Sequence, residues 1–156
     1  MRAYQSFVKW WGKRPSFAWF GRHILTPVDR LTRGRKHTMT TTGTNFPLCY
    51  LTTTGRKSGR PRVVPLLYAG SDNAPVVTGT NFGGDHHPAW AHNLSADPQA
   101  VLQLNGAERP VRARLLSEEE RLSVWPALVA IWPGYVGYVE RSGRIPMTFA
   151  LETEDS

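Results

Sequence analysis

The sequence predicts an α+β fold, a small barrel of mostly antiparallel strands flanked by helices. Two observations favour this class. Short runs of β-branched and apolar residues are separated by turn signals, and only one helix intervenes before a second helical region late in the chain. A doubly wound parallel sheet would need regular alternation of strands and helices and a GxGxxG motif after the first strand, and the sequence has neither.

Three strand-like runs open the predicted barrel, at residues 48–54, 62–69 and 75–80. Glycine, proline and asparagine between these runs supply the turns, so three consecutive strands are expected. A short helix is expected at residues 87–94, because Pro88 suits the first turn of a helix and Pro98 prevents the helix from continuing.

The next part of the chain predicts a hairpin followed by a capped helix. Strands at residues 100–104 and 110–116 flank Asn105-Gly106, a strong signal for a two-residue turn. Ser117 then precedes three glutamates, which places an N-cap before acids that the helix dipole favours. We expect that helix to end near Ile131.

Prolines and glycines divide the C-terminal part. Pro126 is expected to kink the capped helix, and Pro133-Gly134 to interrupt it. A short tyrosine-bearing segment then ends near Gly143, and residues 147–152 are expected to form the closing strand.

Length and cysteine content limit the class of protein. At 156 residues we expect one barrel domain, residues 38–156, with a basic helical appendage at residues 1–37. Cys49 is the single cysteine and lies in an apolar run, which indicates a core residue in a reducing compartment. No run reaches the roughly 20 apolar residues of a membrane span, and a signal-peptide core is lacking. The expected location is the cytoplasm, or the inner face of the cell membrane as a peripheral protein.

The basic character of the chain lies in residues 1–37. This segment has nine lysines and arginines against one aspartate, a net charge of +8, whereas the whole chain carries +7. Tyr4, Phe7, Val8 and Trp11 fall on one helix face, and aromatic residues beside cations are typical of helices at a membrane surface. Two interpretations stay open, a membrane contact and packing on the barrel or a second subunit. Nucleic acid is not expected as a partner, since no nucleic-acid-binding motif accompanies the charge.

Residues 51–67, LTTTGRKSGRPRVVPLL, place a cluster of cations between two expected strands. Gly55, Gly59 and Pro61 favour a tight turn. The cations in this connection are Arg56, Lys57, Arg60 and Arg62. Ser58 and exposed backbone amides add neutral donors, and this mixture suits phosphate oxygens. We therefore expect an anion-binding loop, with a solvated surface loop as the alternative.

Residues 77–94, VTGTNFGGDHHPAWAHNL, form a second candidate region. An expected strand ends in small and hydroxyl residues and leads through Gly83 and Gly84 into a helix whose first turn can face an anion. His86, His87 and His92 do not share one helix face, and no acid or cysteine cluster joins them, so no metal is expected. A GxSxG nucleophile elbow is also lacking.

Three motifs carry a resemblance to a known family. They are LTTTGRKSGRPRVVPL at residues 51–66, PxWxxNL at residues 88–94 and PxYxxY at residues 133–138. The chain resembles the deazaflavin-dependent nitroreductase and quinone reductase family, split β-barrel proteins that use coenzyme F420. The resemblance covers residues 48–146 and implies an oxidoreductase with this fold and cofactor.

The resemblance also implies a set of site residues. The loop from Arg56 matches the one that holds the charged tail of the cofactor, and the strand after it matches the one along the deazaflavin ring. The implied cofactor-binding residues are Arg56, Lys57, Ser58, Arg62, Val63, Val64, Pro65, Leu66, Leu67, Thr78, Gly79, Thr80, Asn81, Ala89, Trp90, Ala91, His92, Asn93 and Tyr138. The implied catalytic residues are Tyr135, Tyr138 and Thr80.

Residue type alone does not decide the role of the two tyrosines, because aromatic residues beside a helix end are usually packing residues. In the motif, they line the substrate side and their hydroxyls can donate a hydrogen bond or a proton. Three positions depart from the family pattern: Thr80 replaces a serine, Asn81 replaces a lysine, and Arg141 stands near the place of a third tyrosine. Nitroimidazole reduction is therefore not assigned.

The function expected from this resemblance is hydride transfer from reduced F420 to an electron-poor acceptor, such as a quinone or a conjugated carbonyl. Menaquinone is an acceptor that would suit a basic, aromatic segment at a membrane surface. The alternatives are a non-catalytic module that carries F420 or a flavin, and an enzyme of the same barrel type that uses FMN. A homodimer is the assembly that the resemblance favours.

Overall fold

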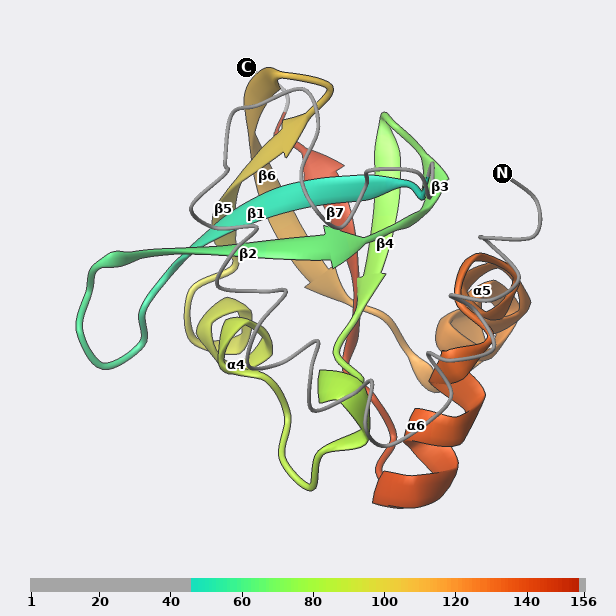
Figure 1. The fold of residues 1–156 in the computed structure, drawn as a ribbon. Helices are drawn as coiled ribbons and strands as arrows, with labels where there is room; N and C mark the ends of the chain where they lie inside the picture. Colours follow the sequence, from blue (N-terminus) through green and yellow to red (C-terminus); the bar gives the residue numbers. More distant parts are fainter. Residues whose placement is uncertain (1–45, 155–156) are drawn as a thin grey trace.

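The computed structural model of the protein describes residues 46–154 (Figure 1). Seven antiparallel strands form one curled sheet in the order β2-β1-β5-β6-β7-β4-β3, and helices lie against it. The predicted α+β class and antiparallel barrel are confirmed. The expected helix at residues 1–37 lies outside the described residues, so the division of the chain at residue 37 stays a prediction.

The strands follow the expected order along the chain. Their bounds are β1 Leu48–Thr54, β2 Pro61–Leu67, β3 Ala69–Ser71, β4 Ala74–Thr78, β5 Gln99–Leu104, β6 Ala107–Leu115 and β7 Thr148–Thr153. β1 lies between β2 and β5, with Leu51 opposite Val64 on one side and Leu102 on the other. The Asn105-Gly106 turn joins β5 to β6 as predicted, and both residues have positive φ (50° and 82°), which a tight hairpin turn of this kind requires.

The expected strand at residues 62–69 is divided into β2 and β3. The chain changes direction at Tyr68, whose N–H donates to the Pro47 carbonyl (3.1 Å) at the end of the β1–β2 register. β2 and β3 then lie at opposite ends of the strand order, although only one residue separates them in sequence. The sheet therefore curls round, but its two edge strands, β2 and β3, are not hydrogen-bonded to each other. The barrel is split because it stays open between these two strands.

The expected strand at residues 75–80 ends earlier, at Thr78. The Gly79 N–H donates to the Met147 carbonyl (2.8 Å), and the chain then enters the short 3-10 turn η2, Asn81–Gly83. Asn81 and Phe82 have φ of 48° and 52°, a conformation incompatible with a continued strand.

Among the described residues, three α-helices accompany the sheet, two of them at expected positions and the third formed by the tyrosine-bearing segment, for which no helix was predicted. They are α4 Ala89–Ala96, α5 Glu118–Ile131 and α6 Gly134–Ser142. α4 begins two residues later than expected, because Pro88 has extended backbone and serves as the N-cap. Ser117 and Glu120 form a capping box at the start of α5, and this helix continues through Pro126.

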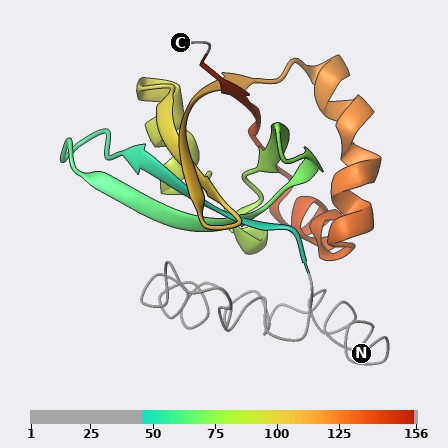
Figure 2. The ribbon, with the colours of Figure 1, turned by 90° about the horizontal axis from the view of Figure 1, so that it is seen from above.

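Two hydrophobic clusters hold the fold together. The first fills the curled sheet and includes Cys49, Leu51 and Leu102, with Trp90 and Leu94 contributed by α4. Cys49 is fully buried, as predicted, and burial raises the pKa of its thiol to about 12. The second cluster lies where α5 and α6 cover one side of the barrel (Figure 2). No helix within residues 46–154 has the length and apolarity of a membrane span.

Candidate functional site

The loop between β1 and β2 carries a concentration of positive charge. Arg56, Lys57, Arg60 and Arg62 are all exposed. Within residues 46–154, the ion pairs join Arg114 to Glu120 and to Glu152, and none involves these four cations. Their charge is therefore available to an external anion, which fits the charged tail of a cofactor.

The backbone of this loop is less available than the sequence suggested. The Gly55 N–H donates to the Arg60 carbonyl and the Gly59 N–H to the Gly55 carbonyl, each at 2.8 Å. The Arg60 N–H donates to Ser58 Oγ (3.2 Å). Internal hydrogen bonds thus occupy amides that we expected to face an anion. The cationic side chains, rather than these amides, give the loop its capacity to bind one.

Asn93 connects the loop to α4. Its side chain is 5% exposed and bridges two partners. Oδ1 accepts a hydrogen bond from the Arg56 N–H (3.0 Å), and Nδ2 donates to Thr53 Oγ1 (3.0 Å). The predicted cofactor residues of the loop and of α4 are therefore held together by one buried amide. Both ends of the amide thus have protein partners, and the predicted contact of Asn93 with the cofactor stays a prediction.

β2 leads away from the loop at an edge of the sheet. Residues 63–67, all predicted to bind the cofactor, are half-buried, and among the described strands they pair with β1 alone. An edge strand presents backbone groups that a ligand can reach. Pro61 and Pro65, which lack an N–H, are tolerated there for the same reason.

The chain between β4 and α4 forms a compact loop at residues 79–87. Thr78 and Thr80 are buried, and the Thr78 hydroxyl pairs with that of Thr148 (3.0 Å). The Asn81 side chain donates to the His86 carbonyl (2.9 Å) inside the loop. Phe82 is a bulky residue with positive φ, a conformation that costs on the order of 1–3 kcal/mol and persists only where surrounding contacts enforce it.

Arg141 Nη2 donates to the Phe82 carbonyl (3.4 Å), and the backbone on either side of Phe82 is held by Arg144, which no sequence motif singled out. Its guanidinium donates to the carbonyls of Gly79 (3.3 Å), Thr80 (2.9 Å) and Gly84 (3.1 Å), and contacts His87 Nδ1 (2.9 Å). Nothing in the sequence pattern around Arg144 points to a loop some 60 residues earlier, because the acceptors are backbone atoms.

The two predicted tyrosines lie in the second hydrophobic cluster. Tyr135 and Tyr138 are 8% and 2% exposed, with ring centroids 6.2 Å apart. Tyr138 Oη accepts a hydrogen bond from Trp132 Nε1 (3.2 Å), and Phe82 of η2 lies edge-on to its ring at 6.2 Å. Burial raises the pKa of both phenols, so both stay protonated at neutral pH.

α6 and η2 approach each other closely at Gly83. A Cβ on Gly83 would lie 3.1 Å from the Tyr138 Cα and 2.9 Å from Arg141 Nη2, so no larger residue fits without a shift. Arg141, near the position where the family pattern has a tyrosine, has its guanidinium carbon 5.5 Å from the centroid of the Tyr138 ring. The structure thus brings Tyr138 beside Phe82 and Gly83, which directly follow the predicted turn at residues 78–81.

The elements that carry the predicted residues contact one another in pairs, α4 with β1 and α6 with η2. In Figure 1 the cationic loop lies at the far end of β1 and β2, α4 and η2 lie below these strands, and α6 lies beyond η2. His86 is exposed, whereas the His87 and His92 rings lie 5.8 Å apart. Within residues 46–154, no group of three or more metal-binding side chains gathers.

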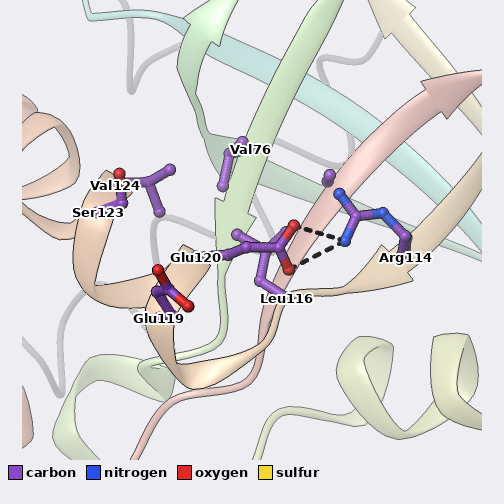
Figure 3. A pocket seen from close by; sticks show the side chains of 8 residues that line it. Val76, Arg114, Leu116, Glu119, Glu120, Ser123 and Val124 are labelled. Carbon is purple, nitrogen blue, oxygen red and sulfur yellow. Dashed lines mark hydrogen bonds and ion pairs between the residues drawn. The ribbon is translucent and has the colours of Figure 1, made fainter.

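A separate hollow lies between α5 and strands β4, β6 and β7 (Figure 3). Val76, Leu116 and Val124 line it, and Arg114 at its edge pairs with Glu120 (2.9 Å) and Glu152 (2.7 Å). None of the predicted site residues lines this hollow. Its one cation is already neutralised by carboxylates, so it does not match an anionic cofactor.

The family model described as F420H(2)-dependent quinone reductase matches residues 27–153. The chain belongs to this family. The F420H(2)-dependent quinone reductase Rv1261c of Mycobacterium tuberculosis is 29% identical over 144 residues, which cover 81% of this chain and 90% of that protein.

Solved structures agree with the family assignment. A structure described as an F420-H2 dependent reductase (FDR-A) is 33% identical, with a TM-score of 0.62 and coverage of 68% of this chain and 94% of that one. Another, described as a domain-swapped dimer, is also 33% identical, with a TM-score of 0.63 and coverage of 68% and 80%. The resemblance, the split barrel, the oxidoreductase class and F420 as the cofactor are confirmed at the level of the family.

Proposed function

We propose that the protein binds reduced F420 along β2 and transfers a hydride from it to a quinone or a related conjugated carbonyl. The observation that carries this proposal is the loop at residues 55–62, whose four cations have no carboxylate partner within residues 46–154. The loop is attached to α4 through Asn93 and leads directly into an edge strand. An anionic tail and a planar ring joined to it fit this succession of features.

The protein's own residues bind, orient and shield. Reduced F420, when bound, supplies the hydride. Arg56, Lys57 and Arg62 neutralise the charge of its tail, while β2 and α4 confine the ring. Tyr138 and Tyr135 remain protonated because burial raises their pKa, so they serve as hydrogen-bond donors to an acceptor oxygen that gains negative charge. Thr80, in the turn that precedes η2, is the third residue that we assign to the catalytic part of the site.

A quinone is the acceptor class that we favour, because the family model and the mycobacterial relative both carry quinone reductase in their descriptions. Menaquinone fits best with a peripheral membrane location, for which the support is the basic, aromatic composition of residues 1–37. A homodimer is a further part of this proposal, supported by the related structure described as a domain-swapped dimer.

Titration of the purified protein with F420 and, in parallel, FMN tests the cofactor, and oxidation of the reduced cofactor by a menaquinone analogue tests the reaction. The double variant Arg56→Ala/Lys57→Ala should raise the Kd for F420 about a hundredfold, since it removes two charge-assisted contacts. The matched control is Arg112→Ala/Arg121→Ala, which removes the same charge from β6 and α5.

Three outcomes separate the alternatives. Turnover together with selective loss of affinity in the first variant supports the reductase and its site. Tight binding of F420 without oxidation of the reduced cofactor by quinones would favour a carrier module instead. Equal affinities in both double variants would remove the proposed site.

A further inference from the structure

Arg144 uses its whole hydrogen-bonding capacity on one loop. Nε donates to the Gly84 carbonyl, Nη1 contacts the Gly79 carbonyl and His87 Nδ1, and Nη2 contacts the carbonyls of Thr80 and Gly84. A guanidinium has five N–H donors, and this one makes five contacts. In the described part of the chain, all of its acceptors belong to residues 79–87.

This loop joins the two parts of the site that lie around the predicted cofactor ring. It begins at the turn of Thr80 and Asn81 and ends at Pro88, the N-cap of α4. Two of its residues have positive φ without being glycine, so the loop shape needs outside support. Arg144 enters from the end of α6, just after Gly143 terminates that helix.

We propose that Arg144 is a positioning residue for the cofactor, which holds the loop at residues 79–87 in its binding shape, and that neutral His87 is required for this hold. The inference rests on the proposed function, because it assigns residues 78–81 and 89–93 to the cofactor. Arg144 acts through the loop carbonyls and does not touch the reacting atoms.

The contact with His87 gives this hold a dependence on pH. Arg144 Nη1 can only donate, so His87 Nδ1 must carry a lone pair and the ring must be neutral. Protonation would place an N–H against an N–H beside a fixed cation. The groups that face this pair are His92, with its ring centroid 5.8 Å from that of His87, and Asp85, whose charge acts on Arg144.

Burial, followed by the charges of Arg144 and His92, lowers the pKa of His87 from its ordinary value of 6.5. The folded protein therefore keeps His87 neutral at pH values where an unfolded chain begins to bind the proton. The stabilising contact is fully present above pH 6.5 and is lost as the pH falls through the folded-state value.

The test compares Arg144→Met and Arg144→Lys with Arg112→Met, an exposed arginine on β6, at pH 8. We expect Arg144→Met to raise the Kd for oxidised F420 by about tenfold to a hundredfold, as misplaced binding groups do. The Kd of Arg144→Lys should lie between those of Arg144→Met and the wild type. In the protein without cofactor, amide hydrogen exchange should accelerate at Gly83 and Gly84, whose N–H groups close the turn.

Unchanged affinity and unchanged exchange in both Arg144 variants would overturn the proposal. If Arg144→Met does not fold, Arg144→Lys decides the matter by the same two measurements. Should the wild type fail to bind F420, the proposed function falls, and exchange at Gly83 and Gly84 still tests whether Arg144 holds the loop.

A pH series tests His87 separately. In the wild type the Kd for F420 should rise as the pH is lowered from about 7.5 to about 4.5, because the folded-state pKa of His87 lies below 6.5. His87→Gln retains a neutral acceptor at all these values, so its Kd should change much less. Superimposable pH profiles of wild type and His87→Gln would overturn the role of His87.

Discussion

Asn93 joins two segments that are distant in sequence, through a single side chain. Its amide has a donor and an acceptor end, and the structure uses both, toward Thr53 and the Arg56 N–H. Aspartate has no donor and leucine has neither group, so neither replacement can satisfy this buried pair. The orientation of the cationic loop therefore depends on a residue for which the family motif implies direct cofactor contact.

Tyr138→Phe should affect stability and turnover in different ways from Tyr135→Phe. Loss of Tyr138 Oη leaves the buried Trp132 Nε1–H without this acceptor, so the free energy of unfolding should fall by about 1–2 kcal/mol. The turnover number with a quinone should fall as well, while the Kd for F420 stays within a few-fold. Denaturant unfolding and steady-state kinetics measure both effects.

Tyr135→Phe is the matched control, because it removes the same atom from a ring that packs against Trp125 and Tyr138. The free energy of unfolding should change less in Tyr135→Phe than in Tyr138→Phe. If Tyr138→Phe turns over quinones as fast as the wild type, Tyr138 is a packing residue and its catalytic assignment must be withdrawn.

Among the elements, the hairpin of β1 and β2 combines continuous strand pairing with a connecting loop that has its own hydrogen bonds. The seven residues of each strand pair without a break, from Leu48 opposite Leu67 to Thr54 opposite Pro61. At the tip, Gly55 leaves room for the Ser58 hydroxyl, which accepts hydrogen bonds from the Arg60 N–H and from Arg62. The loop thus positions its cations through a small internal network.

Gly55→Ala should weaken F420 binding without unfolding the barrel. The added Cβ would lie 2.5 Å from Ser58 Oγ and 3.2 Å from the Arg60 carbonyl, so the serine must move and the network is lost. We expect the Kd to rise by about tenfold, in line with the loss of one or two hydrogen bonds. Fluorescence titration measures this, and circular dichroism checks the fold.

The same substitution in a Ser58→Ala background provides the control. Without the hydroxyl there is less for the new Cβ to displace, so Gly55→Ala should cost less there than in the wild type. Equal costs in the two backgrounds would place the effect on the backbone instead of on this network.

In the molecule as a whole, the net positive charge lies mainly in the N-terminal segment, outside the predicted barrel domain. Residues 1–37 carry a net charge of +8, whereas the rest of the chain is close to neutral. The candidate site nevertheless has its own local concentration of cations in one loop. Two basic regions therefore have two different expected roles, a membrane surface for the first and an anionic cofactor for the second.

Deletion of residues 1–20 should separate these roles. The deleted segment contains four cations, no acid and most of the aromatic residues of the N-terminal region. Co-sedimentation with vesicles that contain phosphatidylglycerol should be lost, and salt should weaken it in the full chain. The Kd for F420 should stay unchanged. Vesicle binding that survives the deletion would exclude this segment as the membrane contact.

Local sequence was sufficient to predict the features that depend on neighbours along the chain. Strand runs, the Asn105-Gly106 turn, the Ser117 cap and the cationic loop all follow from local backbone preference and patterning, and the structure has them close to the expected positions. The family motifs are also local, and they led to the correct cofactor class.

The folded structure was needed to show how these parts meet. It divided one expected strand at Tyr68, ended another at Thr78, and filled the loop amides with internal partners. It also assigned Asn93 and Arg144 to hold loops that lie 37 and about 60 residues away. Such contacts leave little trace in a single sequence, because their acceptors are mostly backbone carbonyls and amides that every residue carries.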